Sequence, residues 1–195
     1  FRGLGAATLA GGPGHNPSTA SMLKASHALP RPAFLLPNNG NVLAVARQAA
    51  ATEAGLLVTP TKSVPQGVAA ALAYDAQAAP EQNLARMSAA AEQVLTAELV
   101  EAARPATLEG VEVRRGQTMV LLDGKLLGVE EPGLAALVER VRVAGSELAT
   151  IYTGAGVSPA DARKLHDYLA GALPSLQVES IHGDQPHARF IVGFE

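Results

Sequence analysis

Short apolar runs and amphipathic stretches alternate along the first half of the chain. The runs 34–36 and 56–58 are typical of buried strands, and a polar loop and a helix-spaced stretch follow each. The run 6–10 has the same position before the first polar loop. Helices are predicted from about 19 to 28, 42 to 54 and 65 to 73, and from Pro80 onward. Ser18 or Thr19 and Asn41 are the expected N-caps of the first two. This order predicts an α/β unit with a mainly parallel sheet.

The second half has a different pattern. Residues 95–103 alternate with a period of two, which predicts a strand, and a continued helix is the alternative. Asp123-Gly124 separates two apolar runs and predicts a type I′ hairpin, into which 111–116 is expected to lead. Further strands are expected at 148–152, 176–181 and 190–194, with helices around 134–141 and after Ser158. We therefore expect a mixed sheet with a hairpin, and two closely packed α/β subdomains, 1–92 and 93–195.

Composition narrows the functional classes. The chain has 195 residues, 48% of them hydrophobic, and a net charge of −3, which opposes a broad basic nucleic-acid-binding face. The absence of Cys excludes disulfides, thiolate catalysis and Cys-ligated zinc. No run of 18 apolar residues and no basic leader occur, so we expect a cytoplasmic protein without an integral membrane segment. A chain that begins with Phe1 rather than Met is expected to be part of a longer protein.

Three polar loops in the first half precede helices and are expected at the carboxyl ends of parallel strands. Ligands bind at that edge of an open α/β sheet, and helix N-termini there favour anions. Lys62 has the only fixed charge among the candidate side chains, so it is the best candidate to meet an acidic group. The alternative is that these residues are ordinary caps and turn formers. The candidate ligand- or partner-binding residues on these loops are Ser18, Thr19, Asn38, Asn39, Thr61, Lys62 and Gln66.

Established catalytic signatures are missing from the sequence. It has no phosphate-binding G-x-x-x-x-G-K-[ST] loop, no G-x-S-x-G elbow and no H-E-x-x-H motif. His182 and His187 flank a segment that could hold a metal, but a polar turn between strands is the preferred interpretation. We therefore expect no catalytic residue and no metal ligand in this chain.

Several motifs together resemble the C-terminal region of the bacterial fatty-acid kinase A protein. The family is also described as DAK-phosphatase-like or dihydroxyacetone-kinase-related, and the resemblance covers nearly the whole chain. The family has G-G-Q-T-M-N-P-S-T where this chain has Pro13-Gly14-His15 before Asn16, and Asn16 joins the candidate residues through this match. The motifs are G-G-x-x-x-N-P-S-T (11–19), L-L-P-N-N-x-N (35–41), P-T-K-x-x-P-Q-G (60–67), Y-D (74–75), G-V-E-V-R-R-G (110–116), D-G-K (123–125), I-Y-x-G (151–154) and G-x-Q-P (183–186).

The resemblance implies a DegV-like fold and a non-catalytic role. In this family a separate N-terminal domain binds Mg-ATP through clustered Asp residues, and nothing in this sequence matches those motifs. The expected role is therefore to dock a DegV-like fatty-acid-binding partner, whose bound fatty acid the full kinase phosphorylates. The resemblance also implies a homodimer through the parent protein. The alternatives are a DegV-like module that itself binds a fatty acid or small ligand, and a stand-alone hydrolase, for which no nucleophile–base pair is evident.

Overall fold

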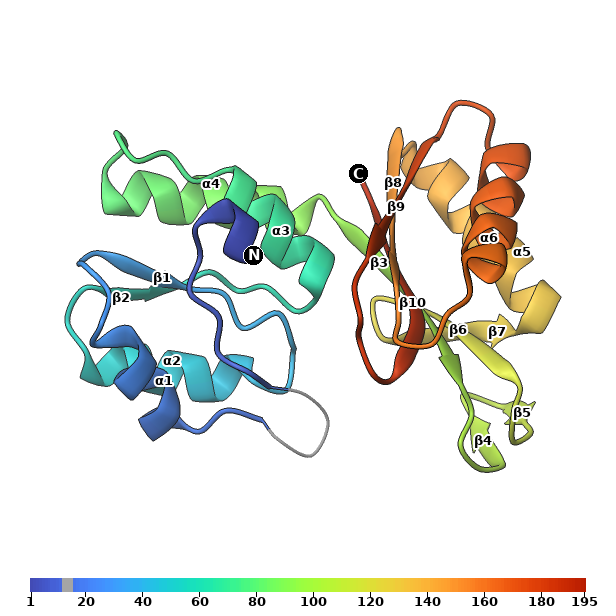
Figure 1. The fold of residues 1–195 in the computed structure, drawn as a ribbon, viewed down its shortest axis with the longest axis horizontal. Coiled ribbons are helices and arrows are strands. Elements are labelled where there is room, and N and C mark those ends of the chain that lie inside the picture. The colour runs from blue at the N-terminus through green and yellow to red at the C-terminus, as the bar shows by residue number, and fades with distance from the viewer. Residues whose placement is uncertain (12–15) are drawn as a thin grey trace. The chain divides into compact units, whose positions relative to one another are not determined.

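The chain divides into two units, Phe1–Val94 and Leu95–Glu195. The computed structural model describes residues 1–11 and 16–195 (Figure 1). The division falls two residues after the boundary that the change of sequence pattern suggests. No helix in the described part of the chain has the length and apolarity that crossing a bilayer requires.

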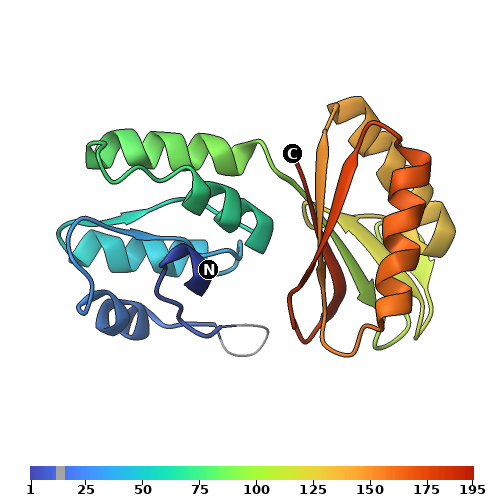
Figure 2. The same ribbon diagram turned by 45° about the horizontal axis from the view of Figure 1, so that its top comes forward.

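Two parallel strands form the centre of the first unit. The strands pair Ala33 with Leu56 and Leu35 with Val58, and helices lie on both of their faces (Figures 1 and 2). Because side chains alternate along a strand, Leu35 packs on one apolar cluster and Phe34 on another. The elements of this unit are η1 (Arg2–Leu4), α1 (Thr19–Ser26), β1 (Ala33–Leu35), α2 (Leu43–Thr52), β2 (Leu56–Val58), α3 (Val64–Leu72) and α4 (Pro80–Glu92).

Two expectations for this unit are wrong. The apolar run 6–10 forms no strand, so the first polar loop does not follow one. Asn41 is not the N-cap of α2, a position that Val42 occupies. The Asn41 N–H instead donates to the Asn39 side-chain oxygen at 2.9 Å, which closes a local turn one residue too early for capping.

The second unit is built on a six-stranded mixed sheet. Its strand order is β7-β6-β3-β10-β8-β9, in which only β8 and β9 are parallel neighbours. Helices α5 and α6 cover the same face of this sheet (Figure 2) and bury Leu137, Leu169 and Phe194 with it. The elements are β3 (Leu95–Glu101), β4 (Ala106–Leu108), β5 (Val111–Val113), β6 (Thr118–Leu122), β7 (Lys125–Val129), α5 (Glu130–Ala144), β8 (Leu148–Thr153), α6 (Pro159–Ala172), β9 (Gln177–His182) and β10 (Ala188–Phe194).

The predicted hairpin is confirmed, and a second one was missed. β6 and β7 pair around Asp123-Gly124, where both residues have positive φ, as a type I′ turn requires. The segment 95–101 is strand β3 and not a continued helix. Segment 111–113, however, does not simply lead into β6. It is β5, which pairs with β4 across a second turn at Glu109-Gly110, again with positive φ at both residues.

Candidate functional site

The candidate site is the edge of the first unit at which β1 and β2 end. Because the two strands are parallel, the loops 36–42 and 59–63 leave the sheet side by side. The Thr59 N–H donates to the Leu35 carbonyl at 3.0 Å and extends the pairing by one residue. Two of the three predicted loops therefore share this edge.

Asn38 and Thr61 join these two loops directly. The Thr61 hydroxyl donates to Asn38 Oδ1 at 2.8 Å and accepts from the Asn38 N–H at 3.0 Å, and Thr61 is fully buried. Asn38 has φ 55°, a left-handed conformation that Asn tolerates better than most residues. Its side chain lies against Gly67 of α3, where a Cβ would stand only 2.5 Å from Asn38 Cγ. The two most specific sequence motifs therefore form one interlocked structure.

Gln66 and Ser63 fix the loop that carries Lys62. The Lys62 N–H donates to Gln66 Oε1 at 2.8 Å, and the Gln66 Nε2 donates to the Val94 carbonyl at 3.4 Å. Ser63 is the N-cap of α3 and accepts from the Gln66 N–H. The Lys62 side chain is exposed and makes no ion pair with the described residues. Of the candidates at this edge, Lys62 is thus the one whose charged end remains available.

The remaining candidates are placed differently. Asn39 uses its side-chain oxygen in the local turn described above. Ser18 caps α1 by accepting from the Ser21 N–H, and the Thr19 hydroxyl donates to Gln48 Oε1 in α2 at 3.4 Å. Asn16 is exposed. The residues 12–15 that depart from the family pattern lie outside the described residues. No contact joins Asn16, Ser18 or Thr19 to the Asn38–Thr61 pair in the described ranges.

Sequence reasoning missed Thr59 at the same edge. Its side chain is fully buried, and its hydroxyl has no hydrogen-bond partner among the described residues. Buried polar groups are nearly always paired, so this hydroxyl is an exception within the edge. The only signal was its position directly after the apolar run 56–58, which burial of a strand end makes plausible for any residue type.

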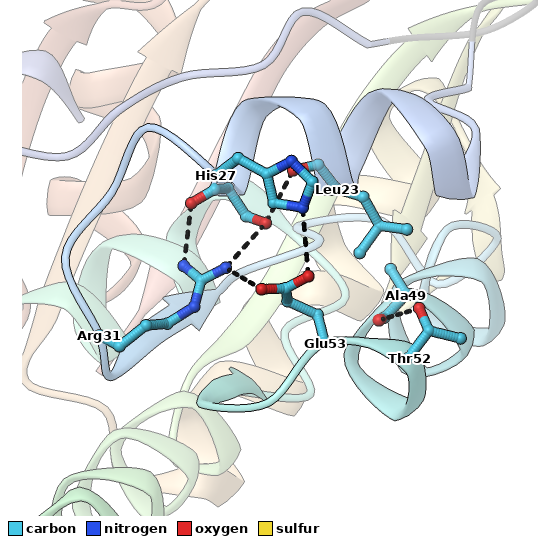
Figure 3. Close-up of polar contacts among 7 residues, drawn as sticks. Leu23, His27, Arg31, Ala49, Thr52 and Glu53 are labelled. Carbon is cyan, nitrogen blue, oxygen red and sulfur yellow. Dashed lines mark hydrogen bonds and ion pairs between the residues drawn. The ribbon is translucent and has the colours of Figure 1, made fainter.

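A second polar cluster joins α1 to the end of α2, and it was also missed (Figure 3). Glu53 accepts from Arg31 at 3.0 Å and contacts His27 Nε2 at 3.1 Å. Arg31 also donates to the Ser26 carbonyl at 2.9 Å. The Arg31 guanidinium, followed by His27, lowers the pKa of the Glu53 carboxyl from its ordinary value. These contacts staple chain segments together, and no sequence motif marks them because the residues are up to 27 positions apart.

The motifs of the second unit also serve close packing. A Cβ at Gly154 would meet the Arg189 carbonyl at 3.2 Å, and the Gln185 side chain donates to the Tyr152 carbonyl at 2.8 Å. The I-Y-x-G and G-x-Q-P motifs therefore hold each other in place. Asp123 of the D-G-K motif accepts from the Thr96 N–H at 3.0 Å.

One face of the second sheet carries two ionisable side chains in a row. Ile191 of β10 pairs with Glu98 on one side and with Tyr152 on the other, so all three side chains share a face. Burial raises the pKa of the Glu98 carboxyl. Burial, with the Glu195 carboxylate, raises the pKa of the Tyr152 hydroxyl. Both groups therefore remain neutral to a higher pH than they would in water.

Comparison with solved structures identifies the fold as DegV-like. A DegV family protein from Corynebacterium glutamicum matches with a TM-score of 0.63 and 15% identity, over 92% of this chain and 82% of that protein. The fatty acid kinase B3 protein of Streptococcus pneumoniae, solved with linoleic acid, matches with a TM-score of 0.62 and 13% identity, over 92% and 76%. Dihydroxyacetone kinase of C. freundii matches with 0.60 and 14%, over 91% and 41%.

The chain belongs to the fatty acid kinase FakA-like, C-terminal family, whose model matches residues 1–195. Protein YloV of Bacillus subtilis is 32% identical over 201 residues, which cover this whole chain and 36% of YloV. An uncharacterized protein of Staphylococcus aureus (strain USA300) is 30% identical over the whole chain and 37% of its own length. The chain thus spans little more than a third of the curated relatives that it matches.

Proposed function

We propose that this chain is the part of a fatty-acid kinase that docks a DegV-like fatty-acid-binding partner. The observation that carries the proposal is the family match over all 195 residues. The interlocked loop edge supports it, because a rigid scaffold that holds a free cation outward suits recognition of a partner carboxylate better than bond-making chemistry. Lys62 is the residue to which we assign this contact.

The full protein would then phosphorylate the bound fatty acid. The γ-phosphorus of ATP would form a bond to a carboxylate oxygen of the fatty acid while its bond to the β–γ bridging oxygen breaks, so that an acyl phosphate and ADP result. We assign Mg-ATP binding to the part of the full protein outside this chain. The chain described here would contribute orientation of the carrier and no reacting group.

Calorimetric titration with the cognate DegV-like protein tests the docking role. We expect saturable binding by the unsubstituted chain and an affinity about two- to fivefold lower for Lys62→Gln, the size expected when one exposed charge pair is lost. Lys24→Gln is the matched control, because Lys24 is also exposed and without an ion pair among the described residues. No heat of binding for the unsubstituted chain, with both proteins folded, would refute the proposal.

A second candidate function is binding of a fatty acid or small acid by this chain itself. The buried Thr59 hydroxyl favours it, because a bound carboxylate at this edge would satisfy a group that lacks a partner among the described residues. Native mass spectrometry should then reveal a co-purifying fatty acid that Thr59→Val abolishes. If no such ligand appears, and added oleate leaves the melting temperature of the chain unchanged, this candidate fails.

A further inference from the structure

The missed hairpin is the end of a longer two-stranded ribbon. β3 and β6 pair Glu101 with Thr118, and further along the same two segments β4 and β5 pair Ala106 with Val113. We call residues 102–117 the arm. In Figure 1 the arm extends past the ends of β3 and β6 and finishes at the turn Glu109-Gly110.

The arm is a built structure and not a loose loop. At its base the Ala102 N–H donates to the Gln117 carbonyl, and the Gly116 N–H donates to the Ala102 carbonyl, both at 2.9 Å. The Gln117 side chain accepts from the Arg114 N–H at 2.8 Å. Val113 is only 2% exposed and anchors β5. Since an isolated two-stranded hairpin is marginal in water, this anchoring is what keeps the arm ordered.

Three cations gather near the base of the arm without a partner. Arg104 lies in the segment that joins β3 to β4, and Arg114 and Arg115 lie in the facing segment that joins β5 to β6. All three are exposed, and their side chains make no hydrogen bond or ion pair with residues 1–11 or 16–195. The arm's own carboxylates, Glu109 and Glu112, lie toward the tip and form no ion pair with them.

This cluster contrasts with the unit that carries it. Residues 95–195 contain nine Lys and Arg against fourteen Asp and Glu, a net charge of −5. Like charges placed together without a counter-ion cost stability, so nothing within the unit accounts for the cluster. A local acidic surface would compensate it. A long polyanion would be repelled by the rest of the unit.

The tip adds apolar area to this charge. Leu108 pairs with Val111 across the turn and is 40% exposed. An apolar contact beside a charged rim is the usual composition of a protein–protein interface. The arm therefore offers the two features that protein recognition requires.

We propose that the arm docks onto an acidic patch of the DegV-like fatty-acid-binding partner. The inference rests on the proposed function, because it names a contact surface for the same partner. Arg104, Arg114 and Arg115 supply the charge complementarity, and Leu108 supplies the apolar contact.

The test compares binding of the cognate DegV-like protein by the full chain and by two triple variants of equal charge change. We expect the arm variant to bind about tenfold more weakly or worse, with a flatter dependence on salt between about 0.05 and 0.5 M sodium chloride, and the control to bind as the unsubstituted chain does. The arm variant is Arg104→Gln, Arg114→Gln and Arg115→Gln. The control is Arg47→Gln, Arg140→Gln and Arg163→Gln, three exposed arginines without ion pairs in the described part of the chain.

Each outcome decides between the two proposals. If the unsubstituted chain binds and the arm variant binds within twofold of it, the arm proposal is wrong and the docking role stands. If the unsubstituted chain does not bind, the docking role fails first. Specific binding of an RNA or DNA oligonucleotide that only the arm variant loses would also overturn the arm proposal. Leu108→Ser is an independent variant, and its exposed position allows it to fold; we expect it to weaken binding as well.

Discussion

Gly67→Ala tests the interlocked loop edge most directly. The new Cβ would stand 2.5 Å from Asn38 Cγ and 2.8 Å from Asn38 Nδ2, so the Asn38 side chain must leave its position. Overpacking of this kind costs about 1–3 kcal/mol. Disturbing the two hydrogen bonds between Asn38 and buried Thr61 adds about 1 kcal/mol each. Replacing Gly by Ala in a helix returns up to about 1 kcal/mol. We expect the free energy of unfolding of the first unit to fall by about 2–4 kcal/mol.

The control for this substitution has the opposite sign. Gly171 lies in α6, and a Cβ there would meet nothing within 4 Å, so Gly171→Ala should stabilise the second unit by up to about 1 kcal/mol. Urea unfolding followed by circular dichroism gives the free energies, and hydrogen exchange assigns each change to its unit. The double variant Asn38→Gly with Gly67→Ala should recover part of the loss, because the colliding side chain is gone. Equal stability of Gly67→Ala and the unsubstituted protein would refute the proposed packing.

Two further substitutions probe the polar contacts outside the loop edge. The pKa of Glu53 is lowered in the folded state, so its ion pairs stabilise the first unit above the unfolded pKa and the stabilisation is lost as the pH falls through the folded pKa. Glu53→Gln should therefore lower stability at neutral pH and flatten the acid limb of the pH–stability curve, and an unchanged acid limb would contradict this. Asp123→Ala should cost the second unit about 1–2 kcal/mol, because the Thr96 N–H loses its acceptor and Ala resists the positive φ. Asp123→Asn, which keeps an acceptor and tolerates that φ, should recover most of the loss in the same urea experiment.

The periodic pattern of the chain predicted most elements because local rules decide them. Ser158 and Pro159 mark the start of α6, and Asp123-Gly124 marks the β6–β7 turn, and each signal lies within four residues of its effect. The β4–β5 hairpin was missed because Glu109-Gly110 is a less usual turn pair and the strands are three residues each. Strand order could not be predicted, since β10 pairs with β3 across more than ninety residues.

The candidate site was predicted in place but not in role. The pattern of strand-end loops brought Asn38, Thr61, Lys62 and Gln66 to one edge, as the parallel pair β1–β2 requires. It could not show that Asn38 reaches Thr61 and Gly67, because a contact across 23 residues has no local signature. It also misplaced the first loop, since the apolar run before it lacks a pairing partner and forms no strand.

The structure separates residues that build a family motif from residues that can recognise a partner. Asn38, Thr61 and Gln66 spend their polar groups on neighbouring loops, so their substitution should lower stability before it affects binding. Lys62 and the arm arginines leave their charges free of contacts within the described chain, so their removal should cost little stability. A binding defect without a stability defect is therefore the signature that distinguishes a docking surface from a scaffold in this fold.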